Sequence, residues 1–351
     1  MSAVAPAPAV SVERWTPASL ASSGGVACLV AALAFVPIAL SANATIKLTT
    51  FLIYLILAAM WNALAGYAGL VSVGQQAFFG LGGYFAIKLS NSGVGIYEAL
   101  VLGALITGAI SIPMSWFMLR LRGGEFAIGM WVVSEVCFRL VGLDHSSGGL
   151  TGTSIGPALD RFSAADQRRY DYWLALGAAV LVLGILYALL RSRTGAALQA
   201  IRDDQEAAAS VGVRVLAGKA VVFVLAGFGC AAAGTLWLAT QITFDPTNDF
   251  FNVKWTAYML FMALVGGLGT FEGPIVGAII FFVVDDRLGN GNYGVWYLVG
   301  LGTAAILFAL LVPRGIWGTI EERFGLRLLP VGYRLRFREA RTARPAAGSR
   351  A

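Results

Sequence analysis

The chain has 351 residues, of which 58% are hydrophobic and only 13% are charged, with a formal net charge of +6 and a mean hydropathy of +0.75. The core of a soluble globular protein cannot absorb so much apolar surface. Charge-free runs cover residues 15–46 and 48–87, and a helix that crosses hydrocarbon needs about 20 such residues. The composition therefore excludes a soluble enzyme and indicates an integral membrane protein.

Apolar segments follow one another along the chain, so the sequence predicts an all-α, polytopic integral membrane protein with about ten transmembrane helices. The transmembrane domain covers residues 26–312, after an N-terminal cytoplasmic segment at 1–25. A cleaved signal peptide is disfavoured, because the region before residue 26 is long and its charges cancel. The predicted segments are Val26–Leu40, Ile46–Ala65, Gly69–Leu89, Tyr97–Leu119, Phe126–Leu143, Tyr172–Leu190, Ala220–Gln241, Trp255–Gly269, Pro274–Val284 and Gly294–Val312.

The stretch from Gly66 to Tyr84 is rich in glycine and contains Gln75 and Gln76. Two interpretations stand side by side. One is a broken or re-entrant helix, since irregular backbone at membrane depth is tolerated only where it is buried or lines a cavity. The other is tight helix packing, because glycine lets two backbones approach closely.

Lysines and arginines beside the spans set the orientation, because positive loops stay in the cytoplasm. They predict that both termini and the loop 191–219 are cytoplasmic. The outer loop 144–170 has the glycine and hydroxyl residues typical of a flexible connection, with a cap over a cavity or a contact for a binding protein as the alternative.

A basic cytoplasmic tail is predicted for residues 313–351, which hold nine arginines and three glutamates. We expect this tail to touch anionic membrane lipids rather than nucleic acid, because arginines just inside a last span commonly meet lipid headgroups. The residues beyond Arg338 have no apolar periodicity and are expected to be disordered.

The cytoplasmic loop reads as a short amphipathic helix between two spans. Such a helix either lies among the lipid headgroups or docks in a groove of a cytoplasmic partner. One face holds Leu198, Ile201, Ala208 and Val211, and another holds Gln199, Arg202, Asp203 and Glu206.

Several motifs carry a resemblance to a known family. Residues 206–212 form E-A-A-x-x-x-G, which looks like the coupling-loop motif of ABC importer permeases, although no I-x-L-P follows. The stretch A-G-Y-A-G-L-V-S-V-G-Q-Q-A-F-F-G-L-G-G-Y at 65–84 resembles the branched-chain amino-acid importer permeases of the LivM type. Further matches lie in the same order at 123–136, 148–154, 193–204 and 266–278.

The resemblance implies a multi-pass permease subunit of the bacterial cytoplasmic (inner) membrane. Leucine, isoleucine and valine are the leading solutes, and other amino acids, amides or urea are alternatives. The implied partners are a second homologous permease, two cytoplasmic ATPase subunits and an extracytoplasmic solute-binding protein. The residues expected to couple to the ATPase are Leu198, Ile201, Arg202, Asp203, Glu206, Ala207, Ala208 and Gly212.

The chain has no Walker A motif of its own, because the nearest string, 212–220, has one residue too many before Gly218 and Lys219 and ends in Ala220. We therefore expect no enzyme and no bound cofactor, with ATP used by a partner subunit. The only histidine, His145, and the three cysteines lack the spacing of a metal or disulfide site, so no metal is expected.

Candidate contacts along the solute path are Gln75, Gln76, Glu135, Arg139 and Thr151. Glu135 and Arg139 are four residues apart on one predicted helix, so they can form a salt bridge with a structural or a path-lining role. A secondary transporter driven by an ion gradient stays open as a second function, although only a weak echo of glycines links the Gly66 and Gly266 regions. A membrane enzyme is the third, and it lacks a catalytic cluster.

Overall fold

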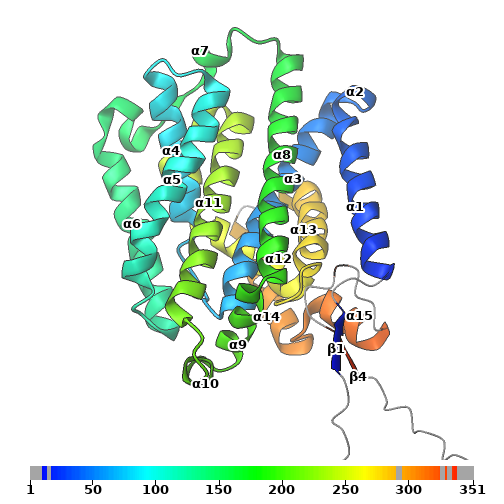
Figure 1. Cartoon of the computed structure of the whole chain (residues 1–351). Coiled ribbons are helices and arrows are strands. Elements are labelled where there is room, and N and C mark those ends of the chain that lie inside the picture. Colours follow the sequence, from blue (N-terminus) through cyan, green and yellow to red (C-terminus); the bar gives the residue numbers. More distant parts are fainter. Residues whose placement is uncertain (1–9, 14–16, 290–294, 325–328, 330–333, 338–351) are drawn as a thin grey trace, which may run out of the picture.

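The computed structural model describes residues 10–13, 17–289, 295–324, 329 and 334–337, and this part of the chain is almost entirely helical (Figure 1). The helices are α1 (Pro17–Ala34), α2 (Val36–Ala39), α3 (Ala42–Asn62), α4 (Gln76–Asn91), α5 (Ile96–Met118), α6 (Gly123–Leu143), α7 (Gly156–Leu159), α8 (Ala164–Arg191), α9 (Arg193–Asp203), α10 (Gln205–Ser210), α11 (Val215–Gln241), α12 (Lys254–Gly266), α13 (Gly273–Val284), α14 (Val295–Leu311) and α15 (Gly315–Phe324).

Each predicted apolar segment contains a helix, but the predicted number of about ten spans is not confirmed. Within the described residues, six helical stretches are long and apolar enough to cross a membrane, namely 42–67, 96–118, 123–143, 164–191, 215–241 and 296–324. The helices α4, α12 and α13 have only 16, 13 and 12 residues. At a rise of about 1.5 Å per residue they are too short to span a bilayer of about 30 Å alone.

The helices stand side by side in one bundle, with short elements at its two ends (Figure 1). One end holds α9, α10, α15 and the two-stranded antiparallel pair β1 (Val10–Glu13) and β4 (Arg334–Phe337). The opposite end holds α2 and α7. Segments close to both termini therefore lie at the end that holds 191–219, as the orientation argument requires, and we call it the inner end. Residues 338–351, where disorder is predicted, lie outside the described part.

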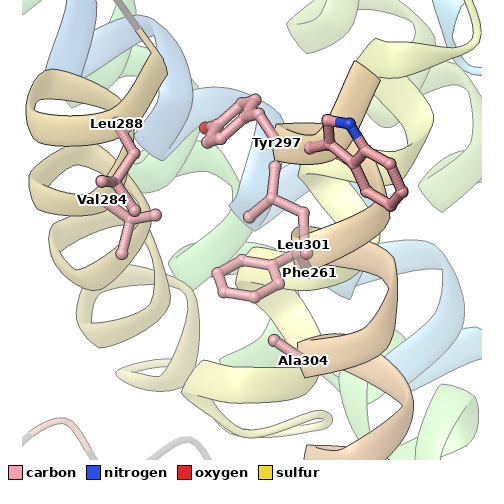
Figure 2. A pocket seen from close by; sticks show the side chains of 8 residues that line it. Phe261, Val284, Leu288, Tyr297, Leu301 and Ala304 are labelled. Atoms are coloured by element: carbon pink, nitrogen blue, oxygen red, sulfur yellow. The ribbon is translucent and has the colours of Figure 1, made fainter. Parts of the chain in front are cut away.

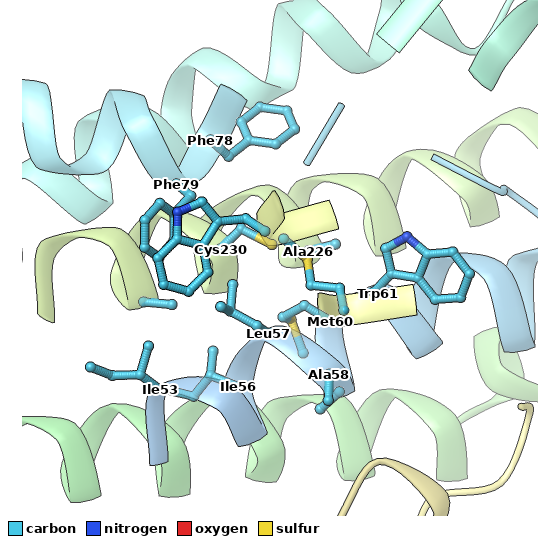
Figure 3. Close-up of a cluster of buried hydrophobic side chains, with 14 of the residues drawn as sticks. Ile53, Ile56, Leu57, Ala58, Met60, Trp61, Phe78, Phe79, Ala226 and Cys230 are labelled. Carbon is cyan, nitrogen blue, oxygen red and sulfur yellow. The ribbon is translucent and has the colours of Figure 1, made fainter. Parts of the chain in front are cut away.

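Burial is concentrated in α3 and α11, whose most apolar windows are 83% and 72% buried. Their side chains interlock with those of α4, as Figure 3 shows for Leu57, Met60, Phe79 and Cys230. Glycines allow this close packing: a β-carbon at Gly234 on α11 would overlap the carbonyl oxygen of Phe79 on α4. Outer helices are much more open, since the window in α6 is only 28% buried.

The region from Gly66 to Tyr84 combines both predicted interpretations. After α3 the backbone forms a π-helical turn (Ala63–Tyr67) and then runs irregularly until α4 begins. Trp61 supports this break by donating its Nε1–H to the carbonyl oxygen of Ser72 at 3.0 Å. Gly80, Gly82 and Gly83 then pack so closely against neighbouring elements that a β-carbon at any of them would overlap Phe251, Ala231 or Phe250.

Another irregular stretch follows α11. The short strand β3 (Thr243–Phe244) and a π-helical turn (Pro246–Phe250) precede the short helix α12. The two short helices meet near their N-termini, where Thr256 donates its hydroxyl to Oε1 of buried Gln76.

The outer loop, which is predicted to be a flexible connection, holds several short regular elements. It contains two 3₁₀ turns (His145–Ser147 and Gly149–Thr151), α7 and the strand β2 (Thr153–Ser154), which pairs with β3. Glycines at positive φ, such as Gly148 at 83° and Gly152 at 78°, allow these tight turns. The loop also ends earlier than predicted, because α8 begins at Ala164. At the other end of the chain, α1 already begins at Pro17, inside the segment predicted as 1–25.

Candidate functional site

The loop 191–219 holds two short helices, α9 and α10, where the sequence pattern predicts one. Asp204 separates them with extended backbone at φ −153° and ψ 110°. Its Oδ1 accepts hydrogen bonds from the backbone N–H groups of Glu206 and Ala207 at 2.9 and 3.0 Å. Aspartate is a preferred N-cap residue, so the sequence contains a signal for a new helix start at Asp204. The amphipathic pattern continues across this residue and hides that signal.

One face of this pair anchors it to the bundle. Leu198, Ile201 and Ala208 are each at most 3% exposed. The space beside Gly218 on α11 is filled by Ile201 Cδ1 and Leu198 Cδ2, which would lie 3.3 and 3.8 Å from a β-carbon there. These three predicted coupling residues therefore face the inside of the chain itself.

The opposite face is open. Asp203, Glu206, Ala207 and Gly212 are exposed, and beside them Val211 is 79% exposed. Gly212 adopts φ +87° and ends α10 in a Schellman-type cap, with the N–H of Val213 donating to the carbonyl oxygen of Ala208 at 3.1 Å. An apolar side chain at the tip of a charged, short helix is available for contact with another protein.

Arg202 points back toward the bundle. Its Nη1 donates to the carbonyl oxygen of Gly66 at 2.8 Å, and its Nε and Nη2 donate to Asp203 Oδ1 at 3.1 and 3.0 Å. It lines a cavity of about 420 Å³ that has both apolar and charged residues in its wall, namely residues 68–71, 121–124, 126–127 and 201–205, and Lys219. The cavity lies between the loop 191–219 and the irregular stretch after α3, at the inner end.

The predicted path residues lie in three separate places. Gln75 and Gln76 are buried at the start of α4, where Gln75 Nε2 donates to Ser72 Oγ at 3.1 Å and its Oε1 has no hydrogen-bond partner. Thr151 is exposed in the outer loop and donates its hydroxyl to the carbonyl oxygen of Gly148 at 2.7 Å. The structure does not bring Thr151 and the two glutamines together.

Glu135 and Arg139 form the predicted salt bridge on α6, with Arg139 Nη2 2.7 Å from Glu135 Oε1. Both side chains are more than half exposed. They lie in a shallow groove of about 410 Å³ whose other walls are apolar, formed by Trp131, Val132, Val136, Leu140 and Leu143. The face is therefore an apolar surface with an ion pair at its centre.

Comparison with known proteins gives the family. The model of the branched-chain amino acid transport system permease component matches residues 43–312. The chain belongs to this family.

Among the relatives of this permease is the high-affinity branched-chain amino acid transport system permease protein LivM of Salmonella typhimurium, 28% identical over 83% of this chain and 73% of that protein. The probable branched-chain amino acid transport permease protein LivM of Methanocaldococcus jannaschii is 25% identical over 68% of this chain and 76% of its own. The ribose import permease protein RbsC of Escherichia coli is 23% identical over 63% and 69%. No solved structure matches. The chain is thus a multi-pass permease of the inner membrane.

The permease also has polar ties at its outer end that sequence reasoning missed. Lys88 on α4 lies 2.5 Å from Asp144 Oδ2 at the end of α6, and Tyr84 donates its hydroxyl to the same oxygen at 2.6 Å. These bonds from Lys88, Ser146 and Tyr84 hold the pKa of Asp144 well below its usual range. In the sequence, the only signal for such a tie is a pair of opposite charges near the ends of apolar segments. That signal does not tell which ends meet.

A second outer tie includes one residue, Tyr297, that lines the cavity in Figure 2. Lys47 on α3 lies 2.6 Å from Asp286 Oδ1. Asp285 accepts hydroxyl hydrogen bonds from Tyr54 at 2.8 Å and Tyr297 at 2.9 Å. Tyr297 also borders an apolar cavity of about 440 Å³ between the end of α13 and α14 (Figure 2). Asp285 and Asp286 thus join α3 and α14 to the end of α13.

Proposed function

We propose that this permease is a transmembrane subunit of an ATP-binding-cassette importer for branched-chain amino acids. In this proposal it forms half of the pathway with a related second permease, receives leucine, isoleucine or valine from an extracytoplasmic solute-binding protein, and is driven by two cytoplasmic ATPase subunits. The chain itself binds no cofactor and hydrolyses no ATP. The names of its LivM relatives support the solute class.

The observation that carries the proposal is the exposed tip of α10. We call Asp203, Glu206, Ala207, Val211 and Gly212 the coupling surface, because all five are exposed at the inner end of the bundle. A short helix that presents one apolar side chain among charges fits a groove in a partner protein. The buried residues Leu198, Ile201 and Ala208 hold this surface to the bundle, so a push on it reaches the membrane helices.

In this proposal the second permease packs against the exposed face of α6. A charge at the centre of a span costs about 2.5–3.5 kcal/mol on insertion scales, and Glu135 and Arg139 lie in the outer half of α6 with more than half of each side chain exposed. The corresponding exposed faces of α5 and α8 show apolar side chains such as Ile112 and Leu181. Lipid therefore suits α5 and α8, whereas α6 suits a protein partner and a wet path between the two permeases.

The glutamines and Thr151 complete this proposal. Gln75 and Gln76 are at the start of a broken helix, where their amides meet the path once the bundle opens, and Thr151 is at its outer mouth. Relatives named as ribose and fructose import permeases cover 63% and 39% of the chain. They favour a different small solute as the second candidate.

The test of the proposal is uptake by proteoliposomes that contain the chain with its partner subunits. We expect labelled leucine to accumulate with ATP, and Glu206→Lys to abolish this accumulation while the chain still inserts, because the substitution reverses a charge on the coupling surface. Glu98→Lys makes the same charge reversal at the outer end of α5 and is expected to leave uptake unchanged. Uptake by the chain without the ATPase, or uptake lost on collapsing an ion gradient while ATP is present, contradicts the proposal.

Gly212 gives an independent test of the same surface. A tryptophan there adds bulk to the surface and forces a side chain into φ +87°, which costs about 1–2 kcal/mol. Gly212→Ala has only the backbone cost, since nothing lies within 4 Å of its β-carbon position. We expect uptake to be lost with tryptophan and largely kept with alanine. Equal uptake by both variants means that Gly212 does not meet the ATPase.

A further inference from the structure

Two helix breaks lie against each other at the inner end. The first is the π-helical turn Ala63–Tyr67 that ends the run of α3, and the second is the turn between α12 and α13. A β-carbon at Gly66 in the first break would overlap the backbone of Gly269 in the second. The two backbones therefore touch directly at this point, beside the side chain of Asn62.

Asn62 joins the two breaks with a pair of hydrogen bonds. Its Nδ2 donates to the carbonyl oxygen of Thr270 at 2.9 Å, and its Oδ1 accepts from the N–H of Gly269 at 2.8 Å. The side chain is 1% exposed. Buried amides are retained where both ends are satisfied, since an unmade bond costs about 1–3 kcal/mol.

Arg202 links helix α9 to this contact. Its Nη1 donates to Gly66 at 2.8 Å, and the same nitrogen would lie 2.9 Å from a β-carbon at Gly269. The carbonyl of Gly66 is at the C-terminal end of a helix, where a positive charge is favourable. Asp203 forms an ion pair with the same guanidinium. One side chain therefore touches both breaks and belongs to the helix beside the coupling surface.

We propose that Arg202 is a positioning residue that transmits movement of α9 to the two breaks, and through them to α4 and α13. Leu198 and Ile201 pack α9 against α11, so a load on the coupling surface moves α9 as a unit and pulls on Gly66. The inference rests on the proposed function, because it needs the ATPase to act on α10. It differs from a docking role, since Arg202 contacts this chain and the coupling surface contacts the partner.

The test measures how accessible the backbone next to the first break is to a thiol reagent. In a chain whose three cysteines are replaced by serine, Val71→Cys places a thiol in the irregular stretch that follows the first break, where Val71 is 49% exposed. The complete importer is reconstituted, and the rate of maleimide labelling is measured with and without ATP and vanadate, together with basal ATP hydrolysis and leucine uptake. Arg202→Ala is compared with Arg193→Ala, which removes the same charge from the exposed start of α9.

We expect nucleotide to change the labelling rate in the parent and in Arg193→Ala but not in Arg202→Ala. Basal hydrolysis stays close to the parent in both, whereas uptake falls about tenfold or more in Arg202→Ala, the size of an ordinary coupling between sites. Arg202→Lys, which keeps the charge but not the forked geometry, is expected to fall in between and serves if the alanine variant does not assemble.

Nucleotide-dependent labelling that persists at the parent level in Arg202→Ala, or in Arg202→Lys if the alanine variant does not assemble, overturns the inference. Equal losses of basal hydrolysis and uptake also overturn it, because they indicate a purely structural role. Failure of the proposed function has a different signature. In that case no ATPase co-purifies with the parent chain, and the parent itself shows no nucleotide-dependent labelling.

Discussion

Single glycines decide how closely the helices of this permease approach. Gly82 on α4 faces α11, and a β-carbon there would overlap the carbonyl oxygen of Ala231. Gly177 on α8 has nothing within 4 Å of its β-carbon position. The two residues look the same in the sequence, since both are glycines inside apolar helices, but only the first is required by packing.

Substitution separates these two roles. We expect Gly82→Ala to destabilise the folded chain by about 1–3 kcal/mol, because overpacking forces the backbones of α4 and α11 apart. Gly177→Ala should be neutral or slightly stabilising, since alanine is the better helix former by about 1 kcal/mol. The midpoint of thermal unfolding in mild detergent measures both. A Gly82→Ala variant as stable as Gly177→Ala means that α4 and α11 are not in this contact.

At the scale of elements, the break at Asp204 determines where the coupling surface lies. In a continuous helix over 193–212, the helical period alone would set the directions of the Glu206 and Val211 side chains. The extended backbone at Asp204 instead starts α10 with its own direction, and the side chain of Lys219 holds that start by donating to Gln205 Oε1 at 2.7 Å. The orientation of the coupling surface thus depends on one N-cap.

Removal of this cap should loosen α10 without affecting α9. We expect Asp204→Ala to cost about 1 kcal/mol of local stability and to speed hydrogen exchange at the amides of Glu206 and Ala207. Asp204→Asn keeps an acceptor oxygen and should exchange like the parent. Unchanged exchange in the alanine variant means that α10 is held by something other than its cap.

At the scale of the whole molecule, the orientation in the membrane is open to direct measurement. In the cysteine-free background, Val211→Cys places a thiol on the inner end and Asp160→Cys places one on the outer end, and both positions are exposed. We expect an impermeant thiol reagent added to intact cells to label only Asp160→Cys, and to label Val211→Cys after the cells are opened. Labelling of Val211→Cys in intact cells contradicts the proposed cytoplasmic position of the coupling surface.

Part of the site was readable from the chain because its signals are local. The i, i+4 spacing of Glu135 and Arg139 predicts their salt bridge, and the structure confirms it at 2.7 Å. The amphipathic period of the cytoplasmic loop predicts which residues separate into two faces, but not that Leu198 and Ile201 turn toward their own bundle. The role of Arg202 was not readable at all, because its partner Gly66 is 136 residues away along the chain.

The sequence by itself determined the class of molecule, the approximate place of the apolar segments and the family. Hydrophobic length and motif order are properties of contiguous residues, so they need no knowledge of packing. Only the tertiary structure decided which helices are too short to cross alone, that the outer loop holds short regular elements, and that the two breaks meet at Asn62. These features depend on contacts between distant segments, and an apolar chain offers many alternative helix pairings of similar hydrophobicity until glycines and buried hydrogen bonds select one.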